Sequence, residues 1–106
     1  MERDIPHPVK LRLSRSAHRD LEKVVRFYHR ESPDLRFQFE DALESALKHV
    51  LLNPHAWQLV EDDTRRILLK GFPYFVYYIV EQDVVAVVAV VHTKRHPGHW
   101  RQRRRS

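Results

Sequence analysis

The chain has 106 residues and no cysteine, and its 19 Lys and Arg against 14 Asp and Glu give a net charge of +5. This length predicts a single domain with one modest core, and the lack of cysteine excludes disulfides and thiolate metal sites. Charges are scattered through residues 1–30 and no apolar run is long enough to span a bilayer, so we expect no secretory signal, no membrane segment and a cytoplasmic location.

The positive charge is concentrated at the C-terminal end. Residues 94–106 carry six Lys or Arg and no acid, whereas the remaining 13 basic and 14 acidic residues sum to −1. Such a segment attracts nucleic acid, an acidic protein segment or anionic lipid, and it can also be a simple solvated tail. We therefore expect one domain over 1–106, with a core over about 8–100 and a basic tail over 101–106.

The first half of the chain predicts a strand followed by two helices. Residues 9–14 alternate apolar with polar, which is typical of a half-buried strand. Ser16 is expected to cap a helix with one apolar stripe. Ser32 followed by Pro33 starts a second helix, which ends at Asn53 because a proline follows. So short a link predicts that the two helices are antiparallel neighbours.

The second half predicts strands. Residues 55–63 have the composition of a polar loop with Trp57 as its apolar anchor. Three β-prone runs follow at 65–70, 74–80 and 84–91, and short turn sequences separate them. Because the connections are short, these runs are expected to form an antiparallel meander.

The last two of these runs are apolar on both faces, which requires cover on both sides of the sheet. A helix pair can cover only one side. We therefore expect aromatic surface on the other side, contributed by Tyr74 and Tyr78 or else by Phe75 and Tyr77. This surface would be open to a partner, a substrate or the C-terminal tail.

Two segments resemble those of a known family. Residues 66–74, Arg-Ile-Leu-Leu-Lys-Gly-Phe-Pro-Tyr, resemble the arginine-led strand and Phe-Pro-Tyr segment of the RelE/ParE superfamily, the toxins of bacterial type II toxin-antitoxin modules. Residues 92–100 resemble the H-x-x-R-x-P-x-x-W ending of ParE-like, plasmid-stabilisation members. The resemblance implies an α+β fold: an N-terminal strand and an antiparallel two-helix hairpin packed on a three- to four-stranded, mainly antiparallel sheet.

The resemblance also implies a function. It implies a toxin that arrests growth until a cognate antitoxin binds it in a hetero-oligomer, with no cofactor. ParE-type members act against DNA gyrase, whereas RelE-type members enter the ribosomal A site and cleave mRNA. This chain lacks a lysine-rich end of its second helix and has Trp100 where RelE-type nucleases often use a C-terminal tyrosine. The ParE-like interpretation is therefore favoured, and the alternatives are an mRNA endoribonuclease and an inactive toxin-fold binding module.

Candidate site residues follow from these alternatives. RNA cleavage by attack of the 2′-hydroxyl needs a base, an acid and cations around the phosphate, and a nuclease would use Arg66, His92 and Arg95. Arg65 and Arg66 point to opposite faces of one strand, and their register is left open. The residues expected to bind the target or the antitoxin are Arg65, Arg66, Tyr74, Tyr78, His92, Lys94, Arg95, Trp100 and Arg101.

The histidines His92, His96 and His99 lie close together in the sequence. Histidine is a common zinc ligand, but structural zinc sites usually add cysteine, and no cysteine is present. We therefore expect no metal site.

Overall fold

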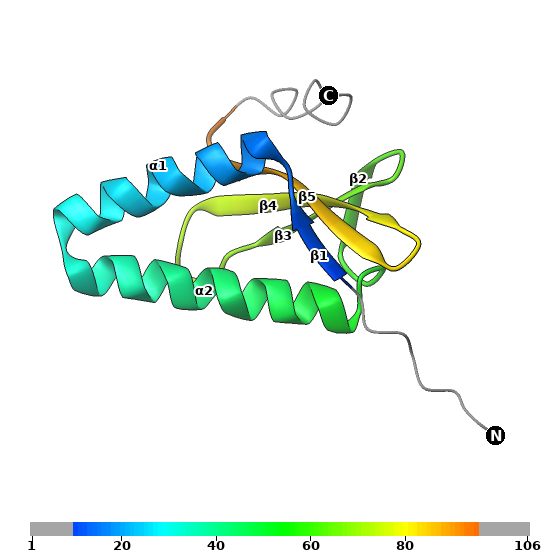
Figure 1. The fold of residues 1–106 in the computed structure, drawn as a ribbon, viewed down its shortest axis with the longest axis horizontal. Coiled ribbons are helices and arrows are strands. Elements are labelled where there is room, and N and C mark those ends of the chain that lie inside the picture. Colours follow the sequence, from blue (N-terminus) through cyan, green and yellow to red (C-terminus); the bar gives the residue numbers. More distant parts are fainter. Residues whose placement is uncertain (1–9, 96–106) are drawn as a thin grey trace.

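The computed structural model describes residues 10–95. Along them run β1 (Lys10–Leu13), α1 (Arg15–Glu31), α2 (Pro33–Leu52), β2 (Gln58–Glu61), β3 (Thr64–Leu68), β4 (Tyr74–Glu81) and β5 (Val84–His92). The strands of this part of the chain form one sheet in the order β1-β5-β4-β3-β2, in which only β1 and β5 are parallel. The two helices form a hairpin beside the sheet (Figure 1).

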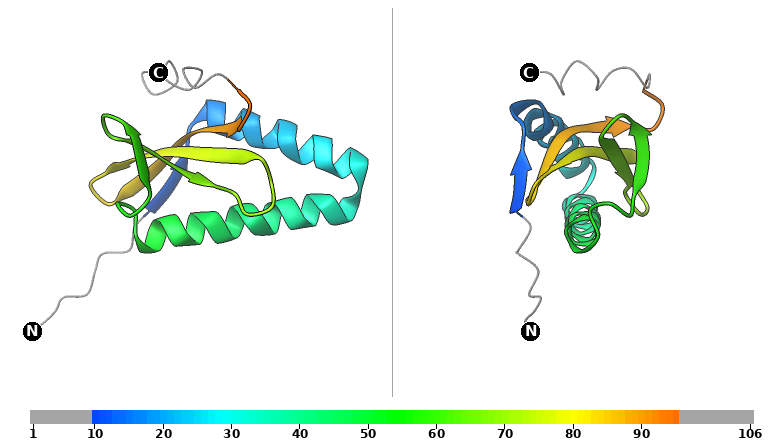
Figure 2. Two further views of the ribbon diagram at one scale, coloured as in Figure 1. Left: turned by 180° about the vertical axis from the view of Figure 1, so that it is seen from behind. Right: turned by 90° about the vertical axis from the view of Figure 1, so that its right-hand side faces the viewer.

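This arrangement confirms the α+β class, the helix hairpin and the antiparallel meander, but the sheet has five strands where three or four were expected. The extra strand is β2, which pairs antiparallel with β3 in the segment predicted to be a loop. β2 has only four residues, and Gln58 and Leu59 are exposed, so its sequence carries too short a pattern to indicate a strand. In the end-on view of Figure 2, β1 and β2 form the two opposite edges of the sheet.

The helix starts show one correction and one confirmation. The hydroxyl of Ser14, not that of Ser16, caps α1 by accepting a hydrogen bond from the Ala17 N–H at 3.0 Å. The Ser14 N–H donates to the Val87 carbonyl of β5, so its backbone stays extended and the helix begins directly after it. For α2 the prediction is confirmed, because the Ser32 hydroxyl accepts from two backbone N–H groups and Pro33 is the first helical residue.

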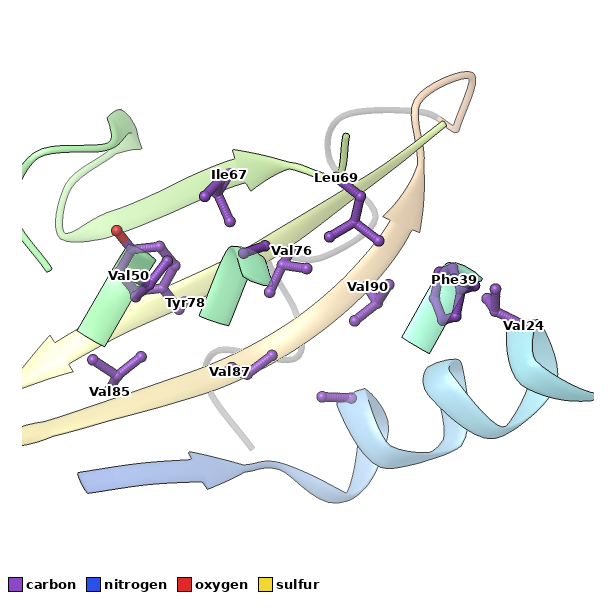
Figure 3. Packing of buried hydrophobic residues seen from close by; sticks show 12 residues of the cluster. Val24, Phe39, Val50, Ile67, Leu69, Val76, Tyr78, Val85, Val87 and Val90 are labelled. Atoms are coloured by element: carbon purple, nitrogen blue, oxygen red, sulfur yellow. The ribbon is translucent and has the colours of Figure 1, made fainter. Parts of the chain in front are cut away.

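The main core lies between the helices and one face of the sheet. Figure 3 shows side chains of both layers pointing toward one another in this space. Burying these apolar side chains provides most of the stability of a domain of this size. The buried residues of this cluster are Ala17, Val24, Phe39, Ala46, Val50, Ile67, Leu69, Val76, Tyr78, Val85, Val87 and Val90.

A smaller apolar cluster lies on the face away from the helices. Its buried residues are Tyr77, Val88, Ala89 and Val91, and Val60, Phe75 and Ile79 pack against them. A β-bulge shapes this cluster: Tyr77 pairs with Ala89 but Tyr78 pairs with Val87, which leaves Val88 as the extra residue. Both Val88 and Ala89 therefore contribute to this cluster.

The two clusters decide which aromatic pair lies on which face. Phe75 and Tyr77 belong to the face away from the helices, while Tyr74 and Tyr78 pack with the main core. The expected open aromatic surface is also smaller than predicted, because Tyr77 is only 3% exposed. The pattern of the strand could not show this, since β4 is apolar on both faces.

Beyond the end of β1, a side chain of α1 provides the hydrogen-bond acceptor for the backbone of β5. The pairing of β1 with β5 ends at Leu13 and Val87. Three residues further on, the Val90 N–H donates to a carboxylate oxygen of Asp20 in α1 at 2.9 Å. A partly buried N–H of the strand is thereby satisfied, and the first turns of α1 are held against the sheet.

We predict that Asp20→Ala lowers the free energy of unfolding by about 2 kcal/mol, because it leaves the Val90 N–H without its charged acceptor. Urea denaturation of the purified variants measures this loss. Asp20→Asn keeps an oxygen acceptor and should lose less, and Glu22→Ala is a matched control, because it removes an exposed ion pair with His18 that contributes about 0.5 kcal/mol or less. Equal stability of the Asp20→Ala and Glu22→Ala variants would contradict the prediction.

Candidate functional site

Arg66 lies on the face of the sheet away from the helices. It pairs across the ladder with Tyr77, and its guanidinium carbon is 3.9 Å from the centroid of the Phe75 ring. Its Nε donates to the side-chain oxygen of Gln58 at 2.8 Å, and its Nη1 donates to the Tyr77 hydroxyl at 3.4 Å. Stacking and two hydrogen bonds therefore fix this guanidinium over the smaller apolar cluster.

Arg65 points to the opposite, helix-facing side of β3, where it pairs with Tyr78. Its Nη1 donates to the Trp57 carbonyl oxygen at 2.8 Å. The guanidinium thus ties β3 to the segment that leads into β2. The structure therefore answers the question of register: Arg66, not Arg65, faces away from the helices.

Tyr78 is fully buried, so its predicted place on a binding surface is wrong. Its hydroxyl donates to the Pro54 carbonyl oxygen at 2.8 Å and so anchors the segment that follows α2. Burial raises the pKa of Tyr78 to about 12, and the nearby Arg65 only partly offsets that rise. Tyr78 is a core residue whose hydroxyl satisfies a partly buried carbonyl.

Tyr74 is half-buried beside the helices and close to the end of β5. Its ring centroid is 5.2 Å from that of His92, 5.9 Å from that of Phe39 and 6.4 Å from that of Tyr28. Burial raises the pKa of Tyr74, the neighbouring Tyr28 adds to the rise, and Arg95 opposes it. Tyr74 therefore connects the aromatic core to a polar cluster at the end of β5.

A groove of about 450 Å³ lies between α1 and the end of β5. It brings Tyr74 together with His92 and Arg95, three of the residues singled out in the sequence. Lys94 is exposed beside this groove, and its backbone N–H donates to Nδ1 of His92 at 3.1 Å. The full lining is Asp20, Lys23, Val24, Phe27, Tyr74, Val90, Val91, His92 and Arg95.

The accepting Nδ1 constrains what His92 can do. A neutral imidazole that accepts a hydrogen bond at Nδ1 carries its proton on Nε2. In this arrangement Nε2–H can donate a hydrogen bond to a ligand, and Nδ1 can act as a base only after the Lys94 N–H releases it.

The candidate nuclease residues are divided between the two faces of the sheet. His92 lines the groove beside α1 together with Arg95, whereas Arg66 belongs to the face away from the helices. The structure therefore does not assemble Arg66, His92 and Arg95 into one centre. Trp100 and Arg101, also predicted as binding residues, lie outside the described residues.

Two polar lining residues of the groove were missed in the sequence: Asp20 and Lys23. Asp20 carried a usable signal, because it lies three residues after Ala17 and four before Val24, at the edge of the apolar stripe. Lys23 carried none, since an exposed lysine is common on helices. Only the packing of α1 against β5 places them at the groove.

Residues 10–95 lack both a metal-binding cluster and a membrane-spanning helix. This part of the chain contains no group of three or more His, Asp or Glu that could hold a metal ion. None of its helices combines the length and the apolar character that are needed to cross a membrane.

Comparisons with known proteins show which family and which solved structures this chain resembles. The family model described as the ParE toxin of a type II toxin-antitoxin system, parDE, matches residues 11–97. The chromosomal ParDE system from P. aeruginosa superposes with a TM-score of 0.70 at 17% identity, over 84% of this chain and 100% of that one. No curated protein matches the sequence.

Two further solved structures come from RelE-type systems. The intact E. coli RelBE toxin-antitoxin complex gives a TM-score of 0.60 at 25% identity, covering 82% of this chain and 99% of that one. The isolated E. coli RelE toxin gives a TM-score of 0.53 at 22% identity, covering 92% of this chain and 97% of that one. The fold is therefore similar to that of both ParE and RelE toxins.

We predict that alkaline pH destabilises the fold through Tyr78. Its pKa is about 12 in the folded state against 10.0 ordinarily, so its contribution to stability is intact below pH 10 and is lost as the pH rises toward 12. Urea denaturation at about pH 9 and pH 11 measures the loss. Tyr78→Phe should be less stable at pH 9, because it leaves the Pro54 carbonyl unpaired, but its further loss at pH 11 should be smaller than that of the wild type. Equal further losses would contradict this assignment.

Proposed function

Because this chain belongs to the ParE toxin family of type II toxin-antitoxin systems, we propose that it arrests growth by binding DNA gyrase and that a cognate antitoxin neutralises it. The observation that carries this proposal is the division of the candidate nuclease residues between the two faces of the sheet. Arg66 lies on one face, while His92 and Arg95 line a groove on the other.

RNA cleavage needs an acid, a base and cations within hydrogen-bonding reach of one phosphate. Arg66 already donates to Gln58 and Tyr77 and stacks on Phe75, on the face that His92 does not share. His92 accepts at Nδ1 from the Lys94 N–H, so this nitrogen can act as a base only after that hydrogen bond opens. These contacts favour inhibition by binding over RNA cleavage.

The groove between α1 and β5 offers a suitable binding surface. It combines two aromatic side chains, Tyr74 and Phe27, with the cations Lys23 and Arg95, and Phe27 is 47% exposed. Aromatic residues and arginine are enriched among the residues that dominate the energy of protein interfaces. We assign the gyrase contact to this groove together with the basic segment that follows it in the sequence.

The antitoxin partner is supported by the solved relatives, which include an intact toxin-antitoxin complex. The cations at the groove and in residues 94–106 would attract an acidic antitoxin segment, with an affinity that falls as salt rises. Such a segment is expected to fold as it binds. We propose that it covers the groove and thereby blocks the gyrase contact.

The first test follows DNA and protein synthesis after the chain is induced in a bacterial host. Incorporation of labelled thymidine should fall before incorporation of labelled amino acid, because gyrase is needed for replication. An earlier fall in amino-acid incorporation would support mRNA cleavage instead, and no fall in either would support a binding module without toxic activity. Co-expression of the antitoxin should restore growth.

Two substitutions extend this test. A nuclease that loses its general acid or base typically loses activity 10²- to 10⁴-fold, so His92→Ala should abolish toxicity if RNA is cleaved. On the gyrase proposal the same substitution only trims an interface and should reduce gyrase inhibition by about tenfold or less. Arg66→Gln, on the other face, should leave gyrase inhibition unchanged. Loss of toxicity in both variants at unchanged stability would overturn the proposal.

A truncation tests the basic segment separately. Ending the chain after Arg95 removes residues 96–106 and keeps every element of the described fold. We expect this variant to remain folded but to inhibit gyrase supercoiling at least tenfold more weakly, because it loses four arginines. Circular dichroism checks the fold. A folded, truncated chain with full inhibition would show that the groove suffices.

A further inference from the structure

The outward side of α1 carries a continuous row of cations. Its five basic residues are spaced by four, four, three and four positions, which at 3.6 residues per turn places them within an arc of about 80°. All five are exposed, and the row extends over about 22 Å of the helix. We call this row the α1 stripe, and its residues are Arg15, Arg19, Lys23, Arg26 and Arg30.

Ion pairing within the described fold does not account for the α1 stripe. None of its five residues forms an ion pair among residues 10–95, where α1 shows one pair, between His18 and Glu22. In α2, by contrast, both cations are paired at i,i+4 spacing: Arg36 with Glu40 at 3.4 Å and Lys48 with Glu44 at 3.8 Å. The cations of α1 therefore remain available to a ligand.

Helix stability does not account for the stripe either. α1 contains five Lys or Arg and three acids, with no acid in its first turn, whereas α2 contains two Lys or Arg and four acids. The helix dipole disfavours Arg15 at the first position and favours Arg30 in the last turn, so these two effects offset, but like charges at i,i+4 along the stripe repel by a few tenths of a kcal/mol per pair. The arrangement is therefore slightly unfavourable for the isolated helix.

The chemistry of the stripe selects its ligand. The 80° arc contains no apolar or aromatic residue, so it lacks the apolar centre in which protein interfaces usually place their arginine anchors. Phosphate contacts need only Lys and Arg, and duplex DNA presents a dense, regular row of phosphates along each strand. We infer that the α1 stripe binds the phosphate backbone of duplex DNA.

This inference rests on the proposed function, because gyrase would bring DNA next to a bound inhibitor. Lys23 belongs both to the stripe and to the groove that holds His92 and Arg95. The DNA contact and the gyrase contact would therefore be adjacent surfaces of α1. A toxin bound through both would hold protein and DNA at once.

Salt-dependent DNA binding by the full chain tests the inference. The probe is a fluorescent duplex of about 30 base pairs, followed by anisotropy between about 50 and 200 mM salt. The test variant is Arg19→Gln with Arg26→Gln, and the control is Arg36→Gln with Lys48→Gln on α2. Both variants lose two charges and keep the same C-terminal tail. Thermal unfolding checks that both are folded.

Each phosphate contact contributes about −0.9 to the slope of log K against log salt. The α1 variant lacks two of these contacts, so its slope should be less steep than that of the wild type by about 1.8. The α2 control should bind with the wild-type slope. Equal changes in both variants would mean that net charge alone governs binding and would overturn the inference, as would a wild-type chain that does not bind duplex DNA. An α1 variant that binds DNA normally but loses affinity for polyglutamate would assign the stripe to an acidic protein instead.

Failure of this inference is distinguishable from failure of the proposed function. If the wild-type chain inhibits gyrase supercoiling but the α1 variant binds DNA with the wild-type salt slope, the gyrase target stands and the DNA contact of the α1 stripe is rejected. If the α1 variant shows a smaller salt slope for DNA binding but the wild-type chain does not inhibit gyrase, the DNA contact stands and gyrase is rejected as the target.

Discussion

The parallel pairing of β1 with β5 is the contact on which the rest of the structure depends. The other strand pairs join neighbours in the sequence, as does the helix hairpin. Among the strands, only β1 brings residues near the start of the described chain to its other end, and directly after β1 the Ser14 hydroxyl donates to the Val88 carbonyl, 74 positions away. This pairing sets the start of α1, and Asp20 extends it beyond the end of β1. The groove that holds His92 and Arg95 exists because α1 is fixed there.

The second constraint is that the central strands are apolar on both faces. The helix hairpin covers one face, and the smaller cluster on the other is built around the bulge in β5 and the stacking of Arg66 on Phe75. Arg66 is thus engaged where it lies, while His92 and Arg95 remain beside the groove. The same division that stabilises both faces of the sheet keeps these three residues apart. It also directs the proposed function toward binding.

Local signals predicted much of this fold, and long-range contacts determined what they missed. Ser32 followed by Pro33 identified the start of α2 because its cap involves only its neighbours. The cap of α1 was placed at Ser16 because Ser14 is positioned by a hydrogen bond to Val87, which no local pattern reveals. β2 was missed because four half-exposed residues carry little periodicity, and only pairing with β3 makes them a strand. Strand alternation likewise separated Arg65 from Arg66 but could not say which faced the helices.

The candidate site was predictable in composition but not in its three-dimensional arrangement. The resemblance to RelE/ParE toxins singled out Arg66, Tyr74, His92 and Arg95, yet their faces depend on the helices and on the bulge. The distribution of charge was not predicted either. The charges of the two helices nearly cancel in total, although α1 is basic and α2 is acidic. Opposite charges on the two helices orient a molecule in the field of a polyanion even when they nearly cancel in total. On both of our proposals, α1 would face DNA while α2 points away. The antitoxin and DNA would then compete for the middle of α1, which borders the groove.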